Sequence, residues 1–341
     1  MQSVQAARAA PGRSMAAHLL AGLILVAGLS AVSWVWADEP PGEAAAFLQQ
    51  VQDAAHKLDY SGVYTYQQGA LLQSSRIVHV VDGTGERERL EILDGAPREY
   101  LRQDGVVQCL LPKQKIVLIQ PHRSDHFPGI LLGPAQEVNA HYELLRHPEK
   151  DRVAGRECTV TDLRARDGLR YGYRICTDSK THLILKAQTV GADGKVIDQV
   201  AFTNLATGKN TDREELKSPW NTRDWRILKT SVKPVDLAAH GWRIVYPDGF
   251  TPLAEISRMM RPGRQADQLV LSDGLAAISI FIETFDQDRD RNVRQGGISH
   301  GAMSIYRRRV ASYWLTAIGE VPAQTVRGLV DTIEYVPLAA H

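Results

Sequence analysis

One motif in the sequence is typical of nucleophilic catalysis, the pattern G-x-S-x-G at residues 297–301. In hydrolases that use it, the serine lies on a sharp turn between a buried strand and a helix, and a histidine activates its hydroxyl. Here residues 286–295 before the motif are highly charged, and the residues after it alternate as in a strand. The sequence therefore favours a glycine-rich turn between strands, and a nucleophilic Ser299 assisted by His300 is the weaker hypothesis.

Two groups of side chains could bind a metal ion. Residues 286–290 carry three alternating aspartates, as at the start of an EF-hand, but Arg291 and Gly297 occupy the positions that need glycine and glutamate. His122 and His126 have helical spacing, although prolines on both sides argue against a helix there. We therefore expect no metal site, and the lack of phosphate-binding glycine patterns predicts no nucleotide cofactor.

Arginines are concentrated in the last third of the chain. On neighbouring strands, alternate arginines would face one side and form a positive patch, suited to an acidic partner segment or a lipid phosphate. An ordinary solvated surface is the alternative. The candidate partner-binding residues are Arg258, Arg261, Arg264, Arg307, Arg308 and Arg309.

Three tyrosines, Tyr60, Tyr64 and Tyr66, lie at the start of the first predicted strand. They could line an apolar cavity inside a curved sheet, because a tyrosine offers an apolar ring and a polar tip. The other interpretation places them in an ordinary core. We take them as candidate residues of a lipid cavity.

The chain has three cysteines. Cys158 and Cys176 lie nearly symmetrically about a hairpin signal at residues 166–168, so they could face each other on adjacent strands and form a disulfide. Cys109 would then be a small buried hydrophobe. A bridge between Cys109 and Cys158 is the rival pairing, and no close cysteine pair suggests redox chemistry.

The first 37 residues have the pattern of a secretory signal peptide. Arg8 and Arg13 precede an apolar run at residues 19–29, and Val35-Trp36-Ala37 suits a signal peptidase, with cleavage after Ala37. An uncleaved membrane anchor is the alternative, although the apolar run is shorter than the roughly 20 residues that span a bilayer. We expect an exported protein, in a compartment that permits disulfides.

The composition is that of a globular protein. The 341 residues include 40 Lys and Arg against 39 Asp and Glu, with 44% hydrophobic residues. These values exclude a disordered or collagen-like chain, and a net charge near zero gives no general attraction to nucleic acid.

The layout predicts a mainly β, α+β protein with two domains. A helix at residues 43–58 precedes about ten or eleven short strands, several separated by Asp-Gly turns, so residues 38–208 are expected to form one antiparallel sheet that curls strongly or closes. Residues 120–150 are read as loop plus a short helix. Residues 209–240 are polar and are read as a linker, and residues 241–341 as a small antiparallel sheet with a C-terminal helix.

Several segments, in this order, resemble the MucB/RseB family, periplasmic negative regulators of the sigma-E (AlgU-type) envelope stress response. The resemblance covers residues 43–336. The matching segments are residues 59–62 (DYSG), 90–98 (LEILDGAPR), 107–112 (VQCLLP), 151–174 (DRVAGRECTV…RDGLRYGYR), 271–275 (LSDGL) and 321–325 (VPAQT).

The resemblance implies a large domain similar to LolA and LolB, an unclosed antiparallel barrel wrapped over helices, followed by a smaller domain. It also implies that the protein binds the periplasmic region of a transmembrane anti-sigma factor of the RseA/MucA kind and shields it from the site-1 protease. Lipid or lipopolysaccharide signals would release it.

Three functions follow as hypotheses. The first is a non-enzymatic periplasmic regulator without cofactor, metal or nucleic-acid partner, for which a homo-oligomer is left open. The second is a lipid or lipoprotein carrier, against which the second domain argues because a carrier needs only the barrel. The third is the hydrolase at Ser299.

Overall fold

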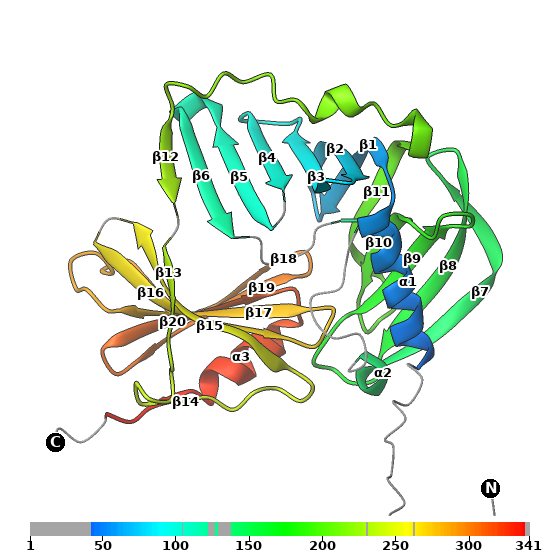
Figure 1. The fold of residues 1–341 in the computed structure, drawn as a ribbon. Coiled ribbons are helices and arrows are strands. Elements are labelled where there is room, and N and C mark those ends of the chain that lie inside the picture. The colour runs from blue at the N-terminus through cyan, green and yellow to red at the C-terminus, as the bar shows by residue number, and fades with distance from the viewer. Residues whose placement is uncertain are drawn as a thin grey trace, which may run out of the picture. The chain divides into compact units, whose positions relative to one another are not determined.

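The computed structural model describes residues 42–103, 105–121, 127–128, 138–229, 231–261 and 263–337. The signal peptide, His122 and His126 lie outside these residues. The described chain is mainly β, with sheets of twelve, seven and two strands (Figure 1). None of its helices is long and apolar enough to cross a membrane.

The large sheet is unclosed. Its order is β12-β6-β5-β4-β3-β2-β1-β11-β10-β9-β8-β7, and every neighbouring pair is antiparallel except β12 and β6. The strands are β1 (Tyr60–Gln68), β2 (Leu71–Asp82), β3 (Gly85–Ile92), β4 (Arg98–Gln103), β5 (Val106–Leu111), β6 (Ile116–Pro121), β7 (Tyr142–Val153), β8 (Arg156–Ala165), β9 (Gly172–Asp178), β10 (Ile184–Val190), β11 (Val196–Thr207) and β12 (Arg226–Lys229).

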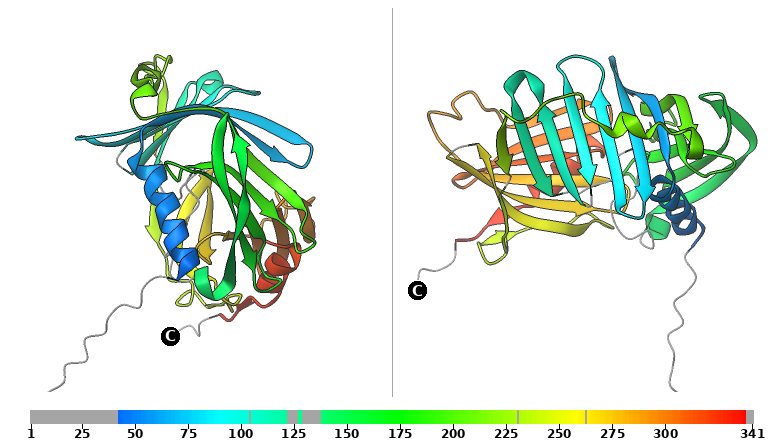
Figure 2. Two further views of the ribbon diagram at one scale, coloured as in Figure 1. Left: turned by 90° about the vertical axis from the view of Figure 1, so that its right-hand side faces the viewer. Right: turned by 45° about the horizontal axis from the view of Figure 1, so that its top comes forward.

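Helix α1 (Glu43–Lys57) lies inside the curve of this sheet (Figure 2). Its apolar residues recur at helical spacing, and Phe47, Leu48 and Val51 are buried against strands β8 to β10 and the short helix α2 (Val138–His141). The helix therefore fills the hollow that a curled sheet would otherwise leave. The predicted helix is confirmed to within one residue.

A cluster of three ionisable side chains fastens the end of α1 to the sheet. The Glu86 carboxylate lies 3.0 Å from His56 Nδ1 and, through its other oxygen, 3.0 Å from His79 Nε2. The other nitrogen of His79 is 2.8 Å from the Leu58 carbonyl oxygen, and the His79 side chain is fully buried. One carboxylate thus joins a helix residue to a strand residue.

We expect this cluster to make the chain less stable in acid. Burial alone would raise the pKa of the Glu86 carboxyl, but the hydrogen bonds from His56 and His79 outweigh it and hold that pKa well below its ordinary value of 4.5. The carboxylate therefore stabilises the fold above its unfolded pKa, and this contribution is lost as the pH falls toward the lowered value.

Urea unfolding of the wild type and of Glu86→Gln, at several values from about pH 6 to about pH 3, measures this contribution. The difference in unfolding free energy should shrink toward low pH. Glu143→Gln, at an exposed glutamate of β7, is the control. A Glu86→Gln difference that stays constant over the whole range would contradict the assignment.

The small sheet has the order β13-β15-β16-β17-β20-β19-β18. Helix α3 (Ala323–Asp331), the predicted C-terminal helix, covers one of its faces with Val326, Leu329 and Val330 buried. The strands are β13 (Val232–Pro234), β15 (Thr251–Arg261), β16 (Arg264–Ser272), β17 (Ala277–Thr284), β18 (Gly296–His300), β19 (Met303–Val310) and β20 (Tyr313–Gly319), and β14 (Trp242–Arg243) pairs separately with β21 (Glu334–Tyr335).

Three local predictions differ from the structure. Residues 142–150 belong to strand β7 and were read as loop because Pro148 lies within a shift of register. Residues 296–300 form strand β18 and were read as a turn, because all five residues are exposed and show no alternation. The segment 209–240 supplies β12 to the large sheet and β13 to the small sheet. These are edge strands, so the inside–outside pattern of a central strand is missing.

Cys158 and Cys176 form a disulfide in the structure, with their Cα atoms 5.5 Å apart on β8 and β9. Both are fully buried in a small apolar cluster with Val153 and Leu185. Cys109 is a buried free thiol.

The described residues from 42 to 337 belong to one compact unit, and a buried ion pair links elements of its two larger sheets. Arg170 follows the turn after β8, and its Nη1 lies 2.9 Å from an oxygen of Asp273, in the turn between β16 and β17. Tyr142 donates a hydrogen bond of 2.9 Å to the same oxygen, and the Arg170 guanidinium lies over the Phe250 ring. Sequence reasoning missed this pair, because only folding brings the residues together.

Candidate functional site

The face of the small sheet that points away from α3, here called the outer face, carries an apolar row. Along each central strand every second side chain faces α3, and those of Leu269, Ile280 and Leu315, for example, are fully buried there. The side chains between them face away from α3. Five of these residues, each directly paired with the next across neighbouring strands, form a row: Val270, Ser279, Ile318, Ile305 and Ile298. These residues are half-buried, and Ile298 at the edge is exposed.

Four of the six candidate arginines lie on this outer face. The strand register places Arg258, Arg264, Arg307 and Arg309 on the same side as the apolar row. The side chain of Arg261 lies outside the described residues.

Arg308 is a correction to the predicted patch. It follows Arg307 directly along the strand, so its side chain points to the α3 side of the sheet. There its Nη1 donates to the carbonyl oxygens of Val330 and Asp331, at 3.1 and 2.9 Å, where α3 ends. A cation at the C-terminus of a helix is favourable. Arg308 therefore stabilises the small domain and does not share the outer face.

The arginines of the outer face differ in how far they are neutralised. Arg264 forms a two-pronged ion pair with Glu283, at 2.5 and 2.8 Å. Arg307 donates to the Thr316 hydroxyl at 3.0 Å, and the Arg309 guanidinium lies 3.7 Å above the Phe285 ring. Within the described residues, neither Arg307 nor Arg309 has a carboxylate partner. Two positive charges are therefore held in place and remain available to a negative ligand.

Two of the described clefts, with volumes of about 440 Å³ and about 420 Å³, contain charged side chains that could contact a ligand. The smaller lies at a corner of the outer face, where Arg309, Phe285 and Trp314 line it together with Asp288 and Arg291. The buried Trp314 indole N–H has no acceptor within the described residues. Its nitrogen has almost no accessible surface, so an oxygen that enters the cleft does not reach this donor unless the surrounding side chains move.

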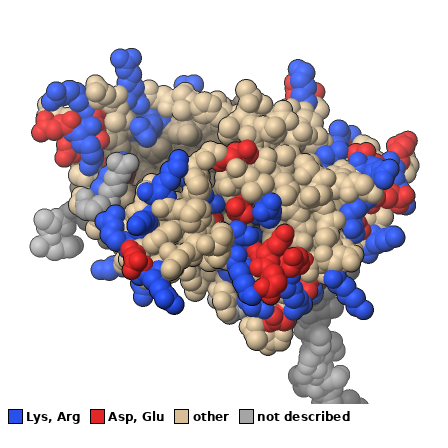
Figure 3. Space-filling model, turned by 90° about the horizontal axis from the view of Figure 1, so that it is seen from above, with Lys and Arg blue, Asp and Glu red and all other residues tan. Residues whose placement is uncertain are grey.

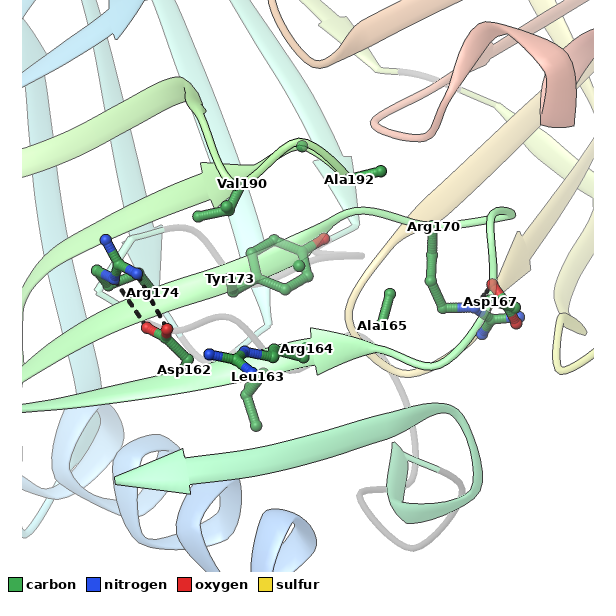
Figure 4. A pocket seen from close by; sticks show the side chains of 13 residues that line it. Asp162, Leu163, Arg164, Ala165, Asp167, Arg170, Tyr173, Arg174, Val190 and Ala192 are labelled. Carbon is green, nitrogen blue, oxygen red and sulfur yellow. Dashed lines mark hydrogen bonds and ion pairs between the residues drawn. The ribbon is translucent and has the colours of Figure 1, made fainter. Parts of the chain in front are cut away.

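The larger cleft lies on the large sheet beside the turn after β8 (Figure 4). At one end Arg174 and Asp162 face each other and form two hydrogen bonds of 2.8 and 3.0 Å, and at the other end Arg170 and Asp167 form an ion pair. These four charges are satisfied by one another, whereas Arg164, which also lines the cleft, is exposed and has no ion-pair partner within the described residues.

Seen from above the view of Figure 1, basic and acidic side chains lie together in small groups around the rim (Figure 3). The middle of that face carries few charged side chains. Proteins that bind nucleic acid typically concentrate positive charge in a stripe or patch on one face.

The three candidate tyrosines do not line a described pocket. Tyr60 is 1% exposed, and its ring stacks on His79 at 4.7 Å between centroids. Tyr64 packs against Phe127 and Phe202, and burial raises its pKa to about 12. Tyr66 is half-buried, with its hydroxyl 3.5 Å from Asp198. Tyr60 and Tyr64 thus lie in the hydrophobic core of the large domain, as the second interpretation expected. An acyl chain could enter this core only by separating these side chains.

The residues considered for catalysis and metal binding are placed as follows. Ser299 lies on the exposed strand β18, and its hydroxyl is 3.2 Å from that of Ser304. It has no histidine hydrogen bond within the described residues, and no helix follows it. The described chain contains no group of three or more His, Cys, Asp or Glu side chains able to hold a metal ion.

The two sheets and the buried link between them define a mainly β protein with a large unclosed sheet and a smaller antiparallel sheet that is covered by a helix. The family model of the MucB/RseB N-terminal domain matches residues 43–220, and that of the MucB/RseB C-terminal domain matches residues 236–334. The chain belongs to the MucB/RseB family.

Its relatives are named as regulators. The Sigma factor AlgU regulatory protein MucB of Pseudomonas aeruginosa is 28% identical over 315 residues, which covers 89% of this chain and 93% of that protein. The Sigma-E factor regulatory protein RseB of Escherichia coli K12 is 25% identical over 308 residues, with 86% and 91% covered.

Solved structures agree with the fold. The crystal structure of MucB in complex with MucA(peri) has a TM-score of 0.66 and 26% identity, and the match covers 87% of this chain and all of that chain. A structure of the Pseudomonas aeruginosa MucA/MucB complex gives the same TM-score with 25% identity and covers 87% and 99%.

Proposed function

We propose that this chain is a periplasmic regulator that binds the periplasmic region of a transmembrane anti-sigma factor and shields it from site-1 proteolysis. The observation that carries the proposal is the similarity over the whole MucB chain to a MucB structure in complex with MucA(peri). The buried disulfide supports an oxidising compartment, in agreement with the predicted signal peptide and cleavage after Ala37.

The outer face of the small sheet is the proposed docking surface. Its apolar row would bury alternate apolar side chains of the partner, and Arg307 and Arg309 would attract acidic ones. A segment bound in this way is covered along one side, so a protease that needs it extended and accessible is excluded.

Calorimetric titration of the chain with the periplasmic domain of its host's own MucA-like anti-sigma factor tests the proposal. We expect 1:1 binding with a Kd of ~1 μM or below. The variant Arg307→Gln/Arg309→Gln should weaken binding at least tenfold, which corresponds to about 1.4 kcal/mol. Arg164→Gln/Arg166→Gln, two exposed arginines of the large domain, is the matched control. Wild-type protein that does not bind, or a bound partner cleaved as fast as the free one, would refute the function.

Release by a lipid signal is the finer part of the proposal. By linkage, a lipid that weakens partner binding must itself bind more weakly to the complex. Purified lipopolysaccharide added to the titration should raise the Kd about tenfold, for which about 1.4 kcal/mol of differential binding suffices. An unchanged Kd would remove the lipid step and leave partner binding intact. The carrier alternative instead predicts acyl chains that copurify with the protein.

A further inference from the structure

The free edges of the two large sheets are not equally protected. Exposed edge strands pair readily with other chains, and natural proteins block them with proline, lysine, short length or bulges. In the described structure the large sheet ends at β7 and β12, and the small sheet ends at β13 and β18. Three of these edges carry such devices: Pro148, Lys150 and a register shift in β7, Arg226 and Lys229 in β12, and Lys233 and Pro234 in β13.

Strand β18 carries none of these devices. Its sequence, Gly-Gly-Ile-Ser-His, has no proline, lysine or carboxylate, and all five residues are exposed, Ile298 by 59%. The strand is nevertheless held in position. Gly301, with φ at +55°, opens the two-residue loop to β19, and the Ala302 amide donates to an Asp198 oxygen on β11 at 2.8 Å. An edge that is both open and fixed is ready to pair without a large ordering cost.

The register identifies the backbone groups at the open edge. In an antiparallel hairpin closed by a two-residue loop, the closing pair exchanges both ladder hydrogen bonds, and alternate pairs do the same. The closing pair here is His300 and Met303. Residues 300, 298 and 296 therefore bond to β19, whereas Gly297 and Ser299 direct their N–H and C=O groups away from the sheet.

The surroundings of the edge define what would fit it. Ile298 ends the apolar row of the outer face, so an added strand would place alternate side chains beside it. Gly296 pairs with Arg307, and Arg309 lies two residues further along β19. A partner strand would therefore meet one apolar side chain at the edge, that of Ile298, and uncompensated positive charge near Gly296.

We propose that β18 is a strand-addition site, which binds an extended segment of the anti-sigma factor with an apolar residue beside Ile298 and at least one acidic residue near Gly296. The proposal rests on the proposed function. A second copy of this chain is the less suitable occupant, because its own β18 contains no acidic residue to offer Arg307 and Arg309. The added strand would continue the small sheet and enlarge its outer face.

The variant Ser299→Pro tests the site directly. Proline removes the outward N–H at position 299, and by the register it leaves the bonds between β18 and β19 in place. Binding of the periplasmic anti-sigma domain should weaken at least tenfold. Ser304→Ala is the matched control, because it removes the hydroxyl contact with Ser299 without changing the edge, and it should bind as the wild type does. Thermal unfolding of both variants establishes that they are folded.

Amide hydrogen exchange on the wild-type protein gives a second readout that needs no substitution. On addition of the partner domain, the amides of Gly297 and Ser299 should become strongly protected. If the wild type binds the partner but Ser299→Pro binds equally well and these amides exchange as before, strand addition is wrong and the regulatory function stands. Protection that instead appears without partner, together with a dimer in sedimentation, would overturn the proposal in favour of self-pairing. A wild type that does not bind at all refutes the function itself.

Discussion

Replacing Arg170 by methionine will lower the free energy of unfolding by about 3–5 kcal/mol. The side chains of Arg170 and Asp273 are both fully buried, and their charged groups lie 2.9 Å apart. Removal of the guanidinium leaves the Asp273 carboxylate in a buried site without a cation. The remaining donors to Asp273, the Tyr142 hydroxyl and the amides of Leu275 and Ala276, do not neutralise its charge.

Urea unfolding followed by fluorescence and by circular dichroism measures this loss, and two probes show whether the two domains unfold together. Arg164→Met, on the same hairpin but exposed, is the control and should change stability by less than about 0.5 kcal/mol. In the double variant Arg170→Met/Asp273→Asn the uncompensated charge is also gone, so the loss should be smaller than in Arg170→Met alone. A single-variant loss below about 1 kcal/mol would show that the pair contributes little.

Loss of the Cys158–Cys176 disulfide will lower the free energy of unfolding by about 3 kcal/mol, because the bridge closes a loop between residues 18 apart in sequence. The constraint acts mainly on the unfolded chain, which becomes more disordered without it. Both sulfurs are buried, so reduction should be slow in the native protein and rapid after unfolding. Refolding under oxidising and reducing conditions therefore isolates the contribution of the bridge from packing changes.

The variant Cys158→Ala/Cys176→Ala should be less stable than the oxidised wild type and insensitive to reductant. Cys109→Ala is the control, because it keeps the bridge and should remain sensitive to reductant. Equal stability of the oxidised and reduced wild type would contradict the prediction.

The local elements could be predicted from the sequence because each has a pattern of its own. The helical spacing of Phe47, Leu48 and Val51 predicted α1, and the Asp-Gly pairs marked the turns of the large sheet. Strand β18 and most of β7 escaped prediction. An edge strand can be exposed on both faces, or interrupted by a proline, so it need not alternate.

The candidate binding surface was likewise predicted only in part. A cluster of arginines was visible in the sequence, but only the register of β19 separates Arg307 and Arg309 from Arg308. Trp314 was not predicted as a lining residue of the corner cleft, because only folding brings it beside Phe285 and Arg309. The three tyrosines left two interpretations open, and the packing of α1 over β1 places Tyr60 and Tyr64 in the core.

The sequence by itself determined the fold class, the order of the main elements and the family, since periodicity, turn residues and ordered motifs are local or linear properties. The tertiary structure decided which charges are neutralised, which strand edge is left open and which residues join the sheets. Arg170 and Asp273 are 103 residues apart in sequence, and only burial in the folded chain turns two ordinary charged residues into one ion pair.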